Sequence, residues 1–278
     1  MVVRSAQIVI GKTLKLAGAV VVAAAMASAC APTVRNTVPP GTSQPDQYLF
    51  ERGTEALNEK KWLTAREFFK MVTETYTQSP YRPDSKLGVG DTYLGEGTPE
   101  ALVLALNEFQ EFLAFYPTHA RADYAQYKVG MTHHRQMRSA GRDQNETRAA
   151  VISFEAFLTR YPNSKLRPEV EARLREARDR VGEHEFGVGR YYYSIRWYPA
   201  AIERWKKLLE VDSAYSGRDA VYFYLGEALI KMGNAPEALP YFERLVTEFE
   251  QSEHLQEARA RIAQLKTTAA ANTGKPSS

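Results

Sequence analysis

Five copies of one apolar pattern constrain the fold of this chain more than any other feature. Each copy has an alanine, a large aromatic residue four positions later, and mostly apolar residues seven and eight positions later. These spacings place the side chains on one face of an α-helix, so each copy predicts the buried stripe of an amphipathic helix. The copies are Ala65/Phe69/Val72, Ala105/Phe109/Phe112/Leu113, Ala150/Phe154/Phe157/Leu158, Ala201/Trp205/Leu208/Leu209 and Ala238/Phe242/Leu245/Val246.

The residues that flank each stripe indicate a repeat of two helices. An aromatic residue stands eleven positions after the alanine in four copies, and the fourth copy departs from this rule; the residues are Tyr76, Tyr116, Tyr161, Asp212 and Phe249. A glycine stands twelve positions before the alanine in copies one, four and five, as Gly53, Gly189 and Gly226. A glycine and an alanine on two antiparallel helices would let the backbones approach closely. Together these spacings resemble the tetratricopeptide repeat.

The spacing between copies departs from the 34 residues of that repeat. Successive alanines are 40, 45, 51 and 37 residues apart. We expect the extra residues in loops at 95–99 and 139–145, and the longest gap in an additional helix at about 167–181 whose stripe includes Val170, Leu174 and Val181. The sequence therefore predicts an all-α, right-handed α-solenoid of about five helix pairs. Repeats 1–3 fall in residues 46–165, and the connecting helix with repeats 4–5 falls in residues 166–266.

Residues 1–29 have the pattern of a removable export signal. A basic start is followed by an apolar run at 16–26 that is too short to span a bilayer. The small residues 27–29 fit a soluble secretion cut, and with Cys30 they also resemble the lipobox of bacterial lipoproteins, although Ala27 stands where leucine is usual. An exported chain with one cysteine cannot form an internal disulfide, which favours lipidation of Cys30. Acyl chains on Cys30 would hold the protein on a membrane.

Both ends of the exported chain are predicted to lack regular structure. Residues 30–45 contain several prolines and little apolar content, which indicates a flexible tether after the lipidated cysteine. Residues 267–278 are rich in alanine, threonine, serine, glycine and proline and show no apolar periodicity. We expect this second segment to be a disordered tail.

The charge balance and the missing motifs exclude several classes of function. Without the three cations of residues 1–29, the chain has 33 basic residues against 33 acidic ones, so nucleic acid is not expected as a partner. The five histidines have neither metal-ligand spacing nor a neighbouring cysteine. Phosphate-binding and dinucleotide-binding loops and the nucleophile elbow are also missing. We therefore expect no catalysis, no cofactor and no metal site.

Binding residues are predicted on the first helix of each pair, which lines the concave surface of tetratricopeptide arrays. Counting from Gly53, and from Gly130 as the anchor of copy three, gives an aromatic-lined groove for an extended peptide, formed by Phe50, Thr54, Asn58, Tyr124, Tyr127, Met131 and His134. The alternative is that Tyr124 and Tyr127 pack between repeats.

Several strings of residues resemble one particular family. They run in order from Phe115-Tyr116-Pro117-Thr118-His119 through Arg160-Tyr161-Pro162-Asn163-Ser164 and His184-Glu185 to Arg190-Tyr191-Tyr192 and Ala200-Ala201-Ile202-Glu203-Arg204. This order is similar to that of the outer-membrane assembly lipoproteins called BamD, ComL or YfiO. The resemblance covers about residues 44–250.

The resemblance implies a lipoprotein of the outer membrane that faces the periplasm. In that family the N-terminal repeats are thought to receive unfolded outer-membrane proteins, and the C-terminal repeats dock on periplasmic domains of a BamA-like β-barrel insertase. Carried over by position, Arg204, Arg190 and Tyr191 would be docking residues. Another exported tetratricopeptide scaffold of the cell envelope, of the CpoB type, is the alternative; it would explain residues 219–249 equally well.

Overall fold

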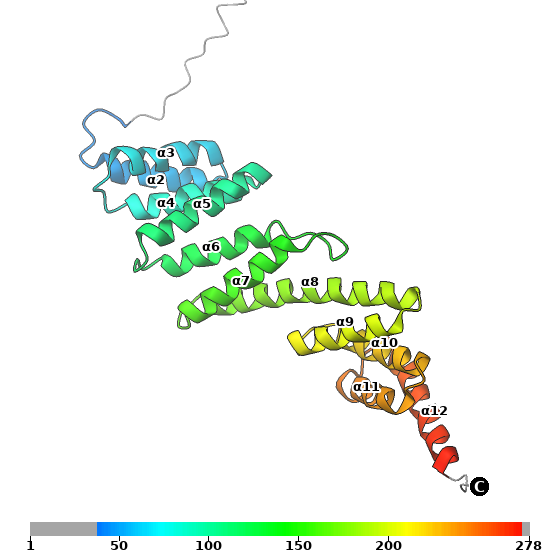
Figure 1. The fold of residues 1–278 in the computed structure, drawn as a ribbon. Helices are drawn as coiled ribbons and strands as arrows, with labels where there is room; N and C mark the ends of the chain where they lie inside the picture. The colour runs from blue at the N-terminus through cyan, green and yellow to red at the C-terminus, as the bar shows by residue number, and fades with distance from the viewer. Residues whose placement is uncertain (1–37, 274–278) are drawn as a thin grey trace, which may run out of the picture.

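The computed structural model describes residues 38–273, which fold into eleven α-helices without a strand. The helices follow one another along an elongated molecule (Figure 1). They are α2 (Pro45–Asn58), α3 (Trp62–Thr75), α4 (Arg82–Glu96), α5 (Pro99–Phe115), α6 (Ala122–His134), α7 (Asn145–Arg160), α8 (Arg167–Ser194), α9 (Tyr198–Val211), α10 (Arg218–Lys231), α11 (Ala235–Glu248) and α12 (Leu255–Thr273).

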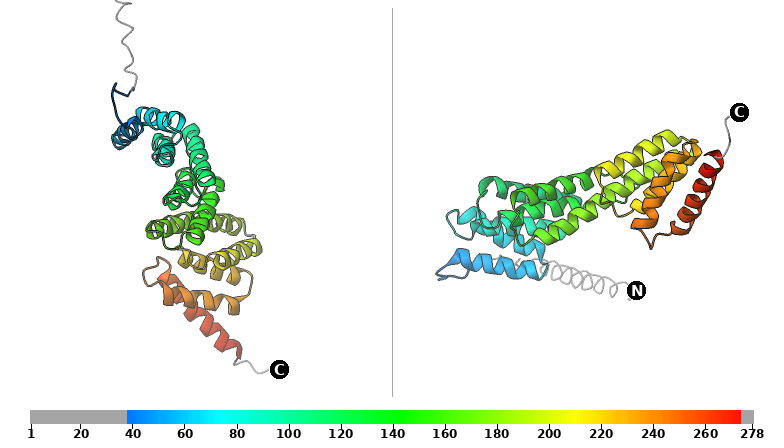
Figure 2. Two further views of the ribbon diagram at one scale, coloured as in Figure 1. Left: turned by 90° about the vertical axis from the view of Figure 1, so that its left-hand side faces the viewer. Right: turned by 90° about the horizontal axis from the view of Figure 1, so that it is seen from below.

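Consecutive helices pack as five antiparallel pairs, α2–α3, α4–α5, α6–α7, α8–α9 and α10–α11, and α12 covers the last pair. The first helices also touch one another, since α2 contacts α4, and α8 contacts both α6 and α10. Figure 2 shows the pairs succeeding one another from α2 at one end to α12 at the other. The predicted all-α solenoid is confirmed.

The aromatic ring of each stripe packs against a glycine of the paired helix. All five alanines of the pattern are fully buried in the second helices. A Cβ atom added to the opposing glycine would lie between 2.1 and 2.8 Å from the ring, so no larger residue fits there. The pairs are Gly53–Phe69, Gly90–Phe109, Gly130–Phe154, Gly189–Trp205 and Gly226–Phe242. Each glycine therefore contacts the aromatic ring of the stripe. The sequence spacing predicted that it would instead lie against the alanine of the paired helix.

The residue eleven positions after the alanine is the C-terminal cap of each second helix. Its backbone N–H donates to the carbonyl oxygen four residues earlier in all five copies. Asp212, the exception among the aromatics, accepts hydrogen bonds through both carboxylate oxygens from Arg175 of α8. An ion pair thus replaces the ring contact at this position, and it lowers the pKa of Asp212 against the opposing effect of burial.

A serine hydroxyl after each of four second helices donates to an aspartate of the same repeat. These bonds are 2.5–2.7 Å long and join Ser79 to Asp46, Ser164 to Asp123, Ser216 to Asp179 and Ser252 to Asp219. Three of the aspartates lie in the first turn of α2, α6 or α10, but Asp179 lies in the middle of α8. The first helix of repeat four therefore corresponds to the second half of α8.

The additional helix predicted at about 167–181 is not a separate element. It continues without a break into the first helix of repeat four, because no proline interrupts the sequence between Pro168 and the end of α8 at Ser194. Val170 and Leu174 are buried as predicted. Val181 is only half-buried, and Ala177 and Gly182 take its place in the core.

The two predicted terminal segments are only partly described. The signal at 1–29 and Cys30 lie outside the described residues, as does the first part of the tether. Val38, near the end of that tether, packs against the core of the first pair. The tail predicted as disordered from residue 267 is wrong at its start, because α12 continues to Thr273. Its alanines at 269–271 have a high helix propensity, which extends the helix although the segment has no apolar periodicity.

Two glycines of α8 give a matched test of the glycine–ring contact. We expect Gly189→Ala to lower the free energy of unfolding by about 1–3 kcal/mol, because the added methyl group meets the Trp205 ring. Gly187→Ala should be neutral or stabilising by up to about 1 kcal/mol, because nothing lies within 4 Å and alanine is the better helix former. Urea unfolding followed by circular dichroism measures both. Equal stability of the two variants would contradict the contact.

Candidate protein-docking surfaces

The predicted groove residues of the first repeat are not equally accessible. The Phe50 ring is half-buried and stacks on Tyr81 with 5.2 Å between the ring centroids. The Thr54 hydroxyl donates to the Phe50 carbonyl oxygen at 2.9 Å. Asn58 is exposed at the end of α2. Of these three, only Asn58 presents its side chain fully to solvent.

Tyr124 joins repeat three to repeat two. Its hydroxyl donates to Asp91 Oδ2 of α4 at 2.8 Å, and Lys128 Nζ lies 3.0 Å from the other oxygen of Asp91. The Arg121 guanidinium stacks on the Tyr124 ring at 4.5 Å. Burial raises the pKa of the Tyr124 hydroxyl far above its ordinary value, and the Asp91 carboxylate adds to this. Tyr124 therefore packs between repeats, which is the second of the two roles considered for it.

The other predicted residues of α6 face the long helix α8. His134 Nε2 lies 3.0 Å from a Glu176 carboxylate oxygen. The Met131 side chain packs against two core clusters, one shared with repeats one and two and the other formed by α7 and α8. Tyr127 is half-buried, and burial together with the Glu169 carboxylate raises the pKa of its hydroxyl. These residues are separated from those of α2 by α4, so the predicted set forms two groups, on the first helices of repeats one and three.

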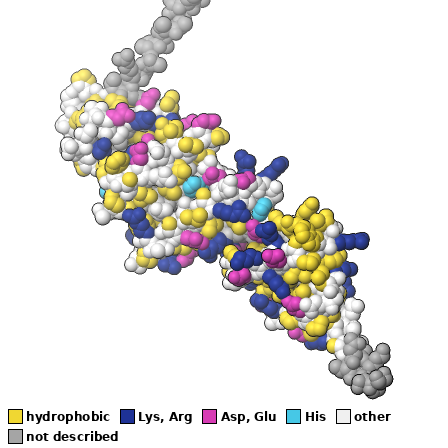
Figure 3. Space-filling model, in the orientation of Figure 1, with side chains coloured by type: hydrophobic (Ala, Val, Ile, Leu, Met, Phe, Trp, Pro, Cys, Tyr) yellow, Lys and Arg dark blue, Asp and Glu magenta, His cyan; other side chains and the backbone are white. Residues whose placement is uncertain are grey.

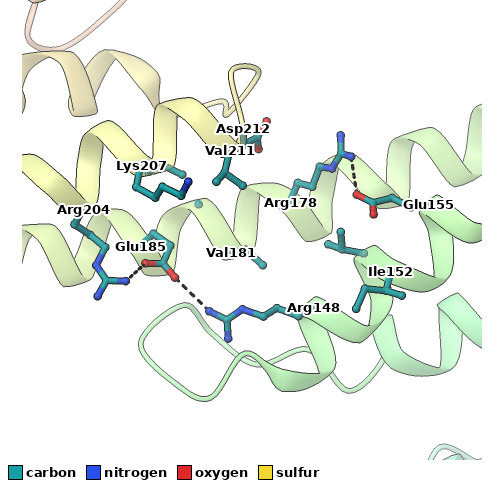
Figure 4. A pocket seen from close by; sticks show the side chains of 13 residues that line it. Arg148, Ile152, Glu155, Arg178, Val181, Glu185, Arg204, Lys207, Val211 and Asp212 are labelled. Atoms are coloured by element: carbon teal, nitrogen blue, oxygen red, sulfur yellow. Dashed lines mark hydrogen bonds and ion pairs between the residues drawn. The ribbon is translucent and has the colours of Figure 1, made fainter.

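Arg204 lines an apolar groove between α7, α8 and α9 (Figure 4). Its volume is about 480 Å³. The apolar side chains of the groove are Val151, Ile152, Val181, Leu208 and Val211. Ile152 is 66% exposed and Val211 is 72% exposed, which leaves much apolar surface open to water. We call this site the Arg204 groove; it exists because both α7 and α9 pack on the single long helix α8.

One carboxylate holds two guanidinium groups at the rim of the Arg204 groove. Glu185 Oε1 accepts from Arg148 Nη2 at 3.2 Å, and Glu185 Oε2 accepts from Arg204 Nη1 at 2.9 Å (Figure 4). The three residues come from α8, α7 and α9 respectively. This cluster has a net charge of +1. Both arginine side chains are more than 40% exposed, so each pair contributes at most about 1 kcal/mol to stability.

The other two predicted docking residues lie on a different side of α8. Arg190 is about 140° around the helix from Glu185, given 100° per residue. Its guanidinium lies 3.8 Å from the centroid of the Tyr224 ring of α10. Tyr191 is exposed near the end of α8. Arg204 therefore does not share a surface with Arg190 and Tyr191, and the predicted docking set is split.

The sequence reasoning missed Arg148, Ile152 and Val211 as residues of the Arg204 groove. Ile152 and Val211 follow the pattern alanines by two and ten positions, so they fall outside the buried stripe of their helices. An apolar residue outside the stripe is the signal that could have identified them. Arg148 gave no comparable signal, because nothing in the local sequence connects it to Glu185.

In residues 38–273 no group of three or more histidine, cysteine or acidic side chains is placed to hold a metal ion. None of the helices in this range is sufficiently long and apolar to cross a membrane.

Comparison with known proteins identifies the family. A family model named YfiO and described as outer membrane lipoprotein matches residues 42–233, which include the first four helix pairs. The chain belongs to this family. A tetratricopeptide-repeat model also matches residues 220–252, in the fifth pair. The predicted BamD (YfiO) membership is thus confirmed.

Relatives of this chain carry the name outer membrane protein assembly factor BamD. The one from Caulobacter vibrioides is 27% identical over 229 residues, covering 82% of this chain and 73% of its own. The one from Vibrio cholerae is 27% identical over 174 residues, covering 59% and 71%. Among solved structures, the TPR2AB domain of yeast Sti1 has a TM-score of 0.44 at 13% identity and covers 81% of this chain and 84% of its own.

The two tyrosines of α6 give a matched test of the packing role. Tyr124→Phe should cost about 1–3 kcal/mol of unfolding free energy, because it removes a donor from the half-buried Asp91 carboxylate. Tyr127→Phe should change stability by less than about 0.5 kcal/mol, because its hydroxyl has no hydrogen bond to the described residues. Thermal unfolding of both variants measures the difference. A larger loss for Tyr127→Phe would contradict this assignment.

Proposed function

We propose that this protein is a periplasm-facing lipoprotein of the outer-membrane β-barrel assembly machinery, which binds unfolded barrel proteins and docks on the insertase. The observation that carries the proposal is the family match over residues 42–233. The names of the BamD relatives support assembly as the activity of this chain. Its role is to bind other proteins, without catalysis.

The Arg204 groove is the proposed docking site for the insertase. Arg148 and Arg204 share a single carboxylate, so the cluster can accept one more acidic group from a partner. The exposed apolar side chains beside it, Ile152 and Val211, can be covered by the same partner. A partner segment that carries a carboxylate next to apolar residues fits both features. Arg190 and Tyr191 lie outside this docking site.

The N-terminal repeats are the proposed site for unfolded substrates. The first helices α2, α4 and α6 follow one another along this half of the solenoid, and an extended peptide can lie across them. We place the contact at the exposed Asn58 and the half-buried Tyr127. Tyr124 supports this surface by fixing α6 against α4, and it does not need to touch the substrate.

The docking proposal predicts a charge-dependent loss of the partner. Arg204→Glu should weaken binding to the insertase at least about tenfold, because it places a repulsive carboxylate beside Glu185. Arg167→Glu is the matched control. Like Arg204, Arg167 is an exposed arginine in an ion pair with a glutamate of α8, but it is not among the residues that line the groove. Co-purification from solubilised membranes and a titration with the purified insertase measure both variants.

The outcomes of that experiment separate the two candidate functions. Recovery of a β-barrel insertase with wild type and Arg167→Glu, but not with Arg204→Glu, supports the docking site. Equal recovery with all three leaves Arg204 without a docking role. Recovery of peptidoglycan-linked or division proteins in place of the insertase would favour an envelope scaffold of the CpoB type.

The proposed anchor has a test of its own. Cys30→Ala should release the protein from membranes into the soluble periplasmic fraction, because the acyl chains would supply the membrane affinity. Fractionation followed by immunoblotting measures the distribution. Cys30→Ser is a second variant that removes the thiol while leaving a side chain of similar size. Full retention of both variants at the membrane would contradict lipid anchoring.

A further inference from the structure

An exposed aromatic turn with cations joins α8 to α9. Ile195, Arg196 and Trp197 are successive residues, and all three are exposed. Trp197 is 57% exposed and Ile195 is 51% exposed, which is unusual for two such large apolar side chains side by side. Arg196 has a φ of 62°, in the left-handed region, so the backbone turns sharply between the two helices.

The apolar surface extends from this turn onto its neighbours. The rings of Tyr191, Tyr192 and Trp197 form a chain, with 5.8 Å and 5.4 Å between successive ring centroids. Met232, at the turn after α10, is 50% exposed and lines the same groove as Pro199 at the start of α9. Figure 3 shows hydrophobic side chains gathered on this part of the molecule. We call the surface the tip patch; its residues are Tyr191, Tyr192, Ile195, Arg196, Trp197, Lys231 and Met232.

The tip patch has a cationic character. Neither Arg196 nor Lys231 forms an ion pair with a carboxylate in the described part of the chain. The adjoining groove is lined by three acidic residues, Glu203, Glu210 and Glu237, and by Lys206 and Lys207. Lys207 Nζ lies 3.1 Å from Glu210. Lys206 Nζ lies 2.5 Å from Glu237 and neutralises its charge. The seven residues of the tip patch include two cations and no acidic side chain, so the tip itself is positively charged, and Glu203 lies in the adjoining groove.

We propose that the tip patch is a membrane contact that binds the headgroup region of an anionic bilayer. Tryptophan and tyrosine favour the membrane–water interface because their rings are apolar and their edges polar. Cations close to an anionic bilayer are attracted to its negative surface potential. The turn Ile195-Arg196-Trp197 connects the ends of two helices and exposes all three side chains, which suits contact with an extended surface such as a bilayer.

This second contact would set the orientation of a lipoprotein on its membrane. A chain held only by its N-terminus rotates freely about the tether, but a second membrane contact on repeat four restricts that rotation. The anchor also raises the effective concentration of the tip patch at the bilayer, so a weak contact is sufficient. This proposal is independent of the Arg204 groove, which contains none of the tip residues.

The test uses tryptophan fluorescence of the full protein, purified as it occurs in cells and reconstituted into vesicles. The chain has only three tryptophans. Trp205 is fully buried and Trp62 is half-buried in repeat one, so Trp197 is the one at the tip. Brominated lipids quench only indoles in contact with the bilayer. We expect such lipids to quench the wild-type emission in vesicles of phosphatidylcholine with phosphatidylglycerol, and to quench it less in phosphatidylcholine alone.

Three variants decide the outcome. Trp197→Phe should lose the quenching, and Trp62→Phe is the matched control that should keep it. Arg196→Glu should lower the quenching while leaving the circular dichroism spectrum unchanged. Quenching that persists in Trp197→Phe, or that is the same with and without phosphatidylglycerol, would overturn the proposal. Loss of a protein partner on Trp197→Ser, with no lipid quenching in wild type, would identify the patch as a protein contact and also overturn it.

Discussion

The packing of an aromatic ring against a glycine of the paired helix is the contact on which the rest of this molecule depends. It recurs in all five pairs, from Gly53–Phe69 to Gly226–Phe242. Because the ring occupies the space that a Cβ atom would fill, the two helices approach closely and the ring is removed from water. Each pair buries its remaining apolar surface against its neighbours, so the contact sets the shape of the unit from which the solenoid is built.

The surfaces proposed to bind partners lie where the repeat is irregular. Helix α8 serves two repeats at once: its first half covers α7, and its second half pairs with α9. The Arg204 groove lies between those two partners, and its rim unites Arg148, Glu185 and Arg204 from three helices. The turn that ends α8 carries the tip patch. The other first helices have 13–15 residues, and a helix of that length could not cover α7 with one half and pair with α9 through the other, as the 28 residues of α8 do.

Features that depend on residues close together in the sequence could be predicted from it, and features that depend on contacts between distant residues could not. Stripes and caps depend on residues within one helix, so the five pairs and the buried Ala201 could be read from spacing alone. The continuity of α8 was missed because the repeat pattern has a gap there, although no proline interrupts the helix. The site was less predictable still. Arg204 was found through a resemblance, but its link to Arg148 depends on Glu185, which brings together residues 56 positions apart.

The unbroken course of α8 has a mechanical consequence. Its 28 residues make a rod of about 42 Å, and a rod of this length displaces its far end by about 0.7 Å for each degree of rotation at the near end. Helix α6 contacts the first half of α8 through the His134–Glu176 pair, and α9 contacts its second half. The N-terminal and C-terminal repeats are therefore connected by one continuous helix. A tilt imposed on the N-terminal repeats is thereby carried to the C-terminal repeats as a rigid movement, without a hinge to absorb it.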